Sequence, residues 1–191
     1  NPGGGLIGDL YSNGGRPTDQ VSLLRSVDRL RREIDTDNEL LATDTYTNRV
    51  LQMLSSTKVR DAFDVKKEPE EVRERYGDHE WCQQALLARR LVESGVNYVT
   101  VVLSNHRSSG TWDTHGDNIP PYGGITKGLG PLLPVFDHLL TTLVEDLRQR
   151  GLADDVLGIA MGEYGRTPQI GTQGSTDGRN HWPYVMSMTL A

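Results

Sequence analysis

Hydrophobic residues in the first part of the chain recur every three or four positions, the spacing of amphipathic helices. The two apolar stripes lie between Thr18 and Leu54 and comprise Val21, Leu24, Val27, Leu30 and Ile34, then Leu40, Leu41, Val50, Leu51 and Leu54. A charged segment, Lys66 to Arg75, follows, and its Pro69 suits the first turn of another helix. We expect the charges of this segment to face solvent. Residues 1–80 are therefore predicted to be a helical segment that packs on a sheet domain.

The second part of the chain alternates between helical stripes and short apolar runs. The pattern predicts, in order, a helix over Trp81–Glu93, a strand over Tyr98–Leu103, a helix with a stripe from Leu132 to Leu147, and strands over Val156–Met161 and Val185–Leu190. Short runs of β-branched and apolar residues are typical of strands buried on both faces. This alternation favours an α/β fold with a doubly wound, mainly parallel sheet over residues 81–191.

Composition narrows the possible functions. Of the 191 residues, 20 are Lys or Arg and 26 are Asp or Glu, giving a net charge of −6. With this acidic balance and no dense basic run, nucleic acid is not an expected partner. No apolar stretch approaches the ~20 residues of a membrane span. The single cysteine, Cys82, excludes an internal disulfide and a cysteine-based zinc cluster. Glycine, at 21 residues, exceeds the ~13 expected at a usual frequency of ~7%, which predicts long loops.

Candidate metal ligands follow the predicted strands. In open α/β sheets, ligands bind at the carboxyl ends of strands, so the loops over residues 104–118 and 162–183 are the first places to search. Asp113 and His115 are two residues apart and face one side of an extended segment. Glu163 follows a predicted strand closely, and His181 lies later in the second loop. Two imidazoles and two carboxylates suit zinc, manganese or iron.

Two arginines in the second loop complete the candidate site. Arg166 or Arg179 would bind an oxyanion with a bidentate guanidinium. Each residue taken alone has a simpler interpretation: Asp113 as a loop cap beside an exposed histidine, Glu163 as an ion-pair partner of Arg166, and His181 as a packed loop histidine. The expected convergence at strand ends favours the shared site.

Several segments resemble the bacterial domain-of-unknown-function family 1501, which is abundant in planctomycetes and placed in the alkaline phosphatase and sulfatase superfamily. They are Leu86–Val96, Gly110–Asn118, Leu152–Val156, Met161–Pro168 and Gly178–Pro183. The resemblance spans nearly the whole chain. It implies an alkaline-phosphatase-like fold that holds one or two divalent metal ions, zinc first, with manganese, calcium or iron as alternatives.

The resemblance also implies roles for individual residues. His181 is similar to a late metal histidine of the superfamily, and Asp113 with His115 to its middle ligands. Gly162-Glu163 stands where sulfatases carry an Asp-His metal pair, so Glu163 would replace the aspartate while the adjacent histidine is absent. Asn180 occupies a position where the family usually has aspartate; asparagine keeps an oxygen acceptor beside the metal histidine and loses the charge.

The implied activity is hydrolysis of phosphate or sulfate esters, with a small-molecule or polysaccharide ester as substrate. Superfamily members carry their nucleophile and first metal aspartate on early strands, which we expect to precede Asn1, so the sheet is expected to be incomplete. Export from the cell is expected only by analogy with the family. The alternative function is a non-catalytic binding or scaffold protein of the same fold, with a structural metal or none.

Overall fold

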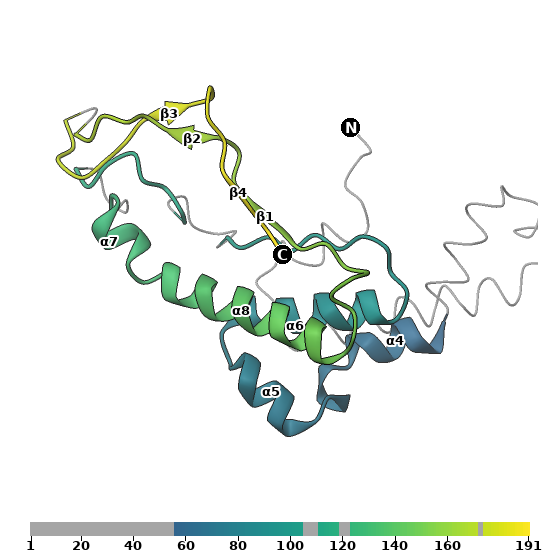
Figure 1. The fold of residues 1–191 in the computed structure, drawn as a ribbon. Helices are drawn as coiled ribbons and strands as arrows, with labels where there is room; N and C mark the ends of the chain where they lie inside the picture. Colours follow the sequence, from purple (N-terminus) through teal and green to yellow (C-terminus); the bar gives the residue numbers. More distant parts are fainter. Residues whose placement is uncertain (1–55, 105–110, 119–122, 172–173) are drawn as a thin grey trace, which may run out of the picture. The chain divides into compact units, whose positions relative to one another are not determined.

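The computed structural model describes residues 56–104, 111–118, 123–171 and 174–191, and the chain divides into two compact units, Asn1–Val101 and Val102–Ala191 (Figure 1). The two stripes predicted as helices before Leu54 lie outside the described residues. The helix predicted over 81–93 belongs to the first unit, although we expected it to open the α/β part. In the described part of the chain, no helix is long and apolar enough to cross a membrane.

The described part of the first unit is helical. Its elements are α4 (Thr57–Phe63), the 3-10 helix η2 (Val65–Lys67), α5 (Glu70–Tyr76) and α6 (Glu80–Glu93). Pro69 immediately precedes α5, as its pattern predicts, and the ring of His79 caps α6 by accepting from the backbone N–H of Trp81 at 3.2 Å. Helix α6 confirms the predicted helix over 81–93, and Gly95 follows its end with a φ of 103° that favours glycine.

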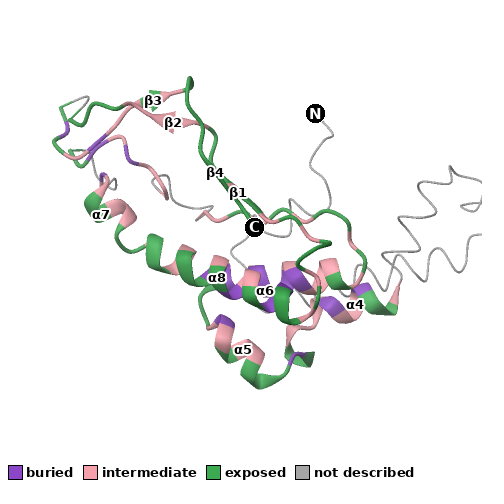
Figure 2. Ribbon diagram, in the orientation of Figure 1, coloured by how far each residue is buried: buried purple, intermediate pink, exposed green. Residues whose placement is uncertain are grey.

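Helices α4 and α5 both pack on α6, and the core of this unit lies between them. The buried apolar side chains are Val59, Ala62, Tyr76, Trp81, Cys82, Ala85, Leu86 and Leu87. Figure 2 shows the buried positions concentrated along α6 and α4. Cys82 is a free, buried thiol, and burial raises its pKa.

One charge in the segment 66–75 is buried, contrary to our expectation that the segment is solvated throughout. The carboxylate of Glu68 accepts from two guanidinium nitrogens of Arg89, at 2.7 and 3.1 Å, and from Arg90. The side chain of Arg89 is fully buried. A buried guanidinium requires a carboxylate partner, so Glu68 is withdrawn from solvent to meet it. Arg90 also donates to the carbonyl oxygens of Asp61 and Ala62, which ties α4 to α6.

The described part of the second unit contains two helices and two short pairs of strands. Its elements are α7 (Thr126–Leu129), α8 (Leu133–Gln149), β1 (Ile159–Met161), β2 (Gly165–Arg166), β3 (His181–Trp182) and β4 (Met188–Leu190). Strand β1 pairs with β4 and β2 with β3, both antiparallel. In the register, Ile159 faces Leu190 and Met161 faces Met188, while Gly165 faces Trp182 and Arg166 faces His181.

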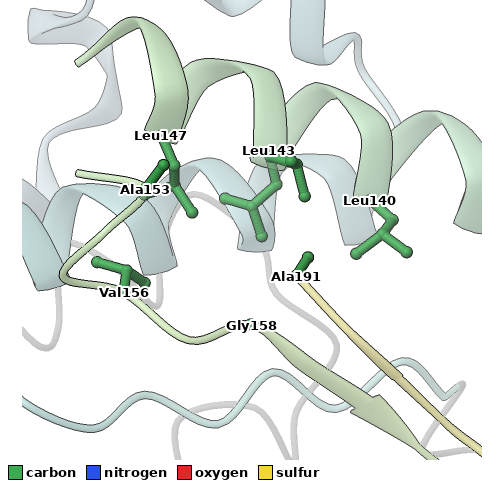
Figure 3. A pocket seen from close by; sticks show the side chains of 8 residues that line it. Leu140, Leu143, Leu147, Ala153, Val156, Gly158 and Ala191 are labelled. Carbon is green, nitrogen blue, oxygen red and sulfur yellow. The ribbon is translucent and has the colours of Figure 1, made fainter. Parts of the chain in front are cut away.

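Helix α8 confirms the predicted helix, and Gly151 follows it with a φ of 70°. Part of its apolar stripe lines a small pocket. Figure 3 shows Leu140, Leu143 and Leu147 of α8 around a small apolar pocket closed on the other side by Ala153, Val156, Gly158 and Ala191. Gly158 and Ala191 exchange two backbone hydrogen bonds, of 2.7 and 3.0 Å, which extends the strand pairing to the pocket.

The strand predictions are only partly confirmed. Residues 98–103 form no strand, and Tyr98 is 84% exposed. A strand requires a neighbouring backbone to pair with, and no described segment pairs with this one. The strands within 156–161 and 185–190 form, but Ile159, Met161, Met188 and Leu190 are each more than half exposed. Both described pairs are antiparallel, so the larger, mainly parallel sheet stays a prediction.

Candidate functional site

The candidate site begins where the loop after Trp112 meets the segment that leads into β3. The backbone N–H of Arg179 donates to the carbonyl oxygen of Thr114 at 2.8 Å, and Thr114 is buried. At Gly178, an added Cβ would lie 2.0 Å from the carbonyl oxygen of His115. Only glycine allows this approach of two backbones. The contact places His115 beside the residues that precede His181.

Asp117 also connects the same two segments, through hydrogen bonds to residues 175 and 176. Its carboxylate accepts from the Ser175 hydroxyl at 2.7 Å and from the backbone N–H of Thr176 at 3.3 Å. These bonds, that of Ser175 first, lower the pKa of Asp117. Asp177 adds a third segment, since its carboxylate accepts from the backbone N–H of Thr126 at the start of α7 at 2.7 Å. The glycine-rich loops therefore hold one another by side-chain to backbone bonds.

The β2–β3 pair places the second half of the site. Arg166 and His181 are paired residues in the antiparallel register, so their side chains lie on the same face. Beyond the strands, the backbone N–H of Thr167 donates to the carbonyl oxygen of Asn180 at 2.9 Å. The guanidinium of Arg179 donates to the carbonyl oxygens of Arg166, at 3.1 Å, and Thr167. The side chain of Arg179 thus donates hydrogen bonds to the backbone carbonyls of Arg166 and Thr167.

Asp113 and His115, whose spacing we interpreted as two ligands of one cation, contact each other directly. One carboxylate oxygen of Asp113 accepts from the backbone N–H of His115 at 2.9 Å and lies 2.7 Å from its ring Nδ1. The first bond is the loop cap that we considered as the simpler interpretation, and the second orients the imidazole. Partial burial raises the pKa of Asp113, but the backbone and ring hydrogen bonds of His115 outweigh it and the net shift is downward.

Arg166 lies against the ring of His115. Its Nη1 is 3.0 Å from Nε2 and 3.2 Å from Nδ1. Because this nitrogen is almost equally far from both ring nitrogens, the guanidinium lies against the imidazole and not along the lone pair of Nε2, while the Nδ1–H of His115 is directed to the Asp113 carboxylate. Asp113, His115 and Arg166 therefore form one connected polar group.

His181 adjoins this group, and Tyr164 adjoins His181. The ring centroids of His115 and His181 are 4.2 Å apart, and those of Tyr164 and His181 are 4.8 Å apart. The Tyr164 hydroxyl is hydrogen-bonded to Nδ1 of His181. Sequence reasoning missed Tyr164. The available signal was its position two residues before Arg166, which puts both side chains on one face of an extended segment.

Glu163 affects the site through the pKa of Tyr164. Desolvation raises the pKa of the phenol first, and the negative charge of Glu163 raises it further. Among the described residues, no three His, Cys, Asp or Glu side chains form a group that could hold a metal ion. The structure thus brings Asp113, His115, Arg166 and His181 together, while a ligand set that includes Glu163 stays a prediction.

Comparisons with known proteins give one match. A family model described as "Protein of unknown function (DUF1501)" matches residues 8–191. No curated protein and no solved structure matches the chain.

Proposed function

Since this chain belongs to the DUF1501 family of proteins of unknown function, we propose its activity from its own side chains: it supplies part of the site of a metal-dependent hydrolase of phosphate or sulfate esters. The observation that carries the proposal is the adjacency of His115 and His181, whose ring centroids are 4.2 Å apart, beside the guanidinium of Arg166. The two histidines are 66 positions apart in the sequence, and the backbone hydrogen bond from Arg179 to Thr114 joins the segments that carry them.

Arg166 is the group proposed to bind the ester's oxyanion. Its guanidinium is already at the imidazole pair, and a planar fork of N–H donors matches two oxygens of a phosphate or sulfate group. Arg179, the other candidate, holds the backbone of residues 166 and 167 instead. Its proposed contribution is to keep Arg166 in place.

Two ring nitrogens fit a divalent metal ion. Because Asp113 binds Nδ1 of His115, Nε2 is left with the lone pair, the arrangement that metal-ligating histidines use. His181 supplies the second imidazole, and the Tyr164 hydroxyl contacts its Nδ1. Imidazoles suit zinc and iron better than calcium. A metal bound here would activate the attacking oxygen and neutralise charge in the transition state.

Arg166 makes the metal proposal testable, because its positive charge lies 3.0 Å from Nε2 of His115, the nitrogen proposed to bind the metal, and two cations repel each other. Replacing Arg166 with alanine is expected to leave zinc affinity intact or raise it. The same change is expected to weaken binding of inorganic sulfate or phosphate by roughly 10- to 100-fold, since a charged hydrogen bond contributes about 1.5–3 kcal/mol. Isothermal titration of the intact protein with each ion measures both effects.

The alternative, a binding or scaffold protein without catalysis, draws support from the same contacts. Each imidazole already has a protein partner at Nδ1, and Arg166 engages His115 further. Such a protein would bind an anionic ester without cleaving it, whether a small molecule or a polysaccharide.

The deciding experiment assays the intact protein, loaded with zinc or manganese, against an aryl phosphate and an aryl sulfate. We expect hydrolysis by the parent and its loss in His115→Ala and His181→Ala, together with about a tenfold or greater loss of metal affinity. His138→Ala, on the exposed face of α8, is the matched control. Anion binding without hydrolysis in the metal-loaded parent would favour the alternative.

A further inference from the structure

Trp112, the residue before Asp113, has a backbone conformation that is unusual for a large side chain. Its φ is 63°, and every other positive φ among the described residues belongs to a glycine. This left-handed region crowds the Cβ of any other residue, so a tryptophan remains there only where its surroundings hold it. The strained residue stands one position before the carboxylate that contacts His115 at the candidate site.

The side chain of Trp112 makes two contacts that hold it. Its indole N–H donates to the carbonyl oxygen of Leu103, nine positions earlier in the chain. Its ring packs edge-on against Phe136 of α8, with centroids 6.0 Å apart and an interplanar angle of 84°. Edge-to-face pairs are favourable, and an indole N–H that is withdrawn from water needs an acceptor. The two contacts therefore fix the indole to the backbone of Leu103 and to α8.

The loop that carries Asp113 and His115 is also held beyond these two residues. The carbonyl oxygen of Thr114 accepts from the backbone N–H of Arg179 at 2.8 Å. Asp113 thus lies between two fixed points, the indole of Trp112 and the carbonyl of Thr114. Ordinary φ values lie at about −50° or below, so relaxation of Trp112 would turn the chain by more than about 110° around one bond. Part of that turn would fall on Asp113 and move its carboxylate away from the His115 ring.

A turn that only reversed the chain would suit glycine, which adopts this conformation without strain. Tryptophan adds an N–H donor and a ring that contacts α8. We propose that Trp112 is a positioning residue, whose indole holds the left-handed turn from which Asp113 reaches the ring of His115. The inference rests on the proposed function for the use of that ring, but the position of the loop does not depend on activity.

The first test uses the intact parent protein and follows exchange of the Trp112 indole N–H with deuterium by NMR. The variants Trp81→Phe and Trp182→Phe identify the other two of the three indole resonances. We expect exchange at least about tenfold slower than in the urea-unfolded protein, because a hydrogen-bonded N–H exchanges only when its contact opens. Exchange as fast as in the unfolded protein would contradict the inference without any change at Trp112.

The second test compares two variants of Trp112. Trp112→Phe keeps a ring that can meet Phe136 but removes the N–H donor, whereas Trp112→Gly accepts the turn without strain but removes both contacts. In each variant we expect the nuclear Overhauser contact between the rings of His115 and His181, whose centroids are 4.2 Å apart in the parent, to be lost. Zinc affinity should fall about tenfold, as when a group that orients a metal-binding histidine is removed.

Trp81→Phe, which makes the same change at a buried position on α6, is the matched control. It should lower the midpoint of urea unfolding and leave the His115 ring contacts unchanged. All proteins are compared under conditions where each is folded, so a residue that only stabilises the fold would not alter these contacts.

Ring contacts and zinc affinity that match the parent in Trp112→Gly would show that the turn alone places the loop, and the inference would then fail. The same result in Trp112→Phe would refute the role of the indole N–H. If the variants lose the ring contacts but the parent binds no zinc and cleaves no ester, the positioning role holds and the proposed hydrolase function fails.

Discussion

Gly178 shows how a single residue controls the site. No side chain fits at this position, because the backbone of His115 occupies the space that a Cβ would need. A backbone atom cannot rotate away as the end of a flexible side chain can. The adjacency of His115 and His181 thus depends on a residue that contributes no chemistry of its own.

We expect Gly178→Ala to separate the two segments and destabilise the second unit by about 1–3 kcal/mol, the usual cost of forced overpacking. Gly162→Ala is the control, since a Cβ at Gly162 meets nothing within 4 Å. Chemical denaturation gives the stability, and the His115 ring resonances report the site. Equal stability and unchanged resonances in the two variants would show that the close approach is not present in solution.

At the scale of elements, the helices were predicted best. The patterns for α6 and α8 locate them to within about two residues, because an apolar stripe and a C-terminal glycine are local signals. Strands were predicted less well, as the run Tyr98–Leu103 shows: it has the residues of a strand but no described partner. Pairing is a long-range property that a local pattern does not encode.

In the candidate site, too, local relationships were predicted better than contacts between distant segments. Asp113 and His115 could be placed on one side of the loop because their spacing of two residues is local, but the hydrogen bond between them was not predicted, and their role as metal ligands stays a prediction. The approach of His181 to His115 was expected from the loops at strand ends, and the structure brings the two together through backbone contacts. Tyr164 was missed because its significance depends on His181, which lies on the partner strand.

The packing of α6 on its neighbours depends on a charge that the sequence pattern assigned to solvent. Glu68→Gln should destabilise the helical unit by about 1–3 kcal/mol, because the buried guanidinium of Arg89 then keeps only Glu93, at 2.8 Å, as a carboxylate partner. Glu70→Gln, at an exposed position on α5, should change stability by less than about 0.5 kcal/mol. Urea denaturation measures both, and similar losses in the two variants would contradict the role of the buried pair.

At the scale of the whole molecule, the β1–β4 pair has two different faces. Gly158 and Ala191 line the pocket under α8, whereas the alternate positions carry apolar side chains that are half exposed or more within the described residues. These are Ile159, Met161, Met188 and Leu190. The doubly wound fold that we predicted covers both faces of its sheet with helices. The solvent exposure of these four side chains in the intact protein therefore tests that fold class.

If the doubly wound sheet forms in the intact protein, Met161 and Met188 will be shielded by a second layer. We expect hydrogen peroxide to oxidise both much more slowly in the folded protein than in the urea-unfolded protein, as measured by mass spectrometry of peptides. Met186, two residues before Met188 in the same predicted strand, should be protected with them. Rates in the folded protein that approach those of the unfolded protein would contradict the predicted fold class.

The central claim is that His115 and His181 serve one site, and a double-mutant cycle of zinc binding tests it most directly. Zinc affinity is measured by isothermal titration for the intact protein, His115→Ala, His181→Ala and the double variant. Because two ligands of one ion are coupled, each single change should remove most of the affinity and the second change should add little. Losses that simply add, or single variants that bind zinc as tightly as the parent, would contradict a shared site.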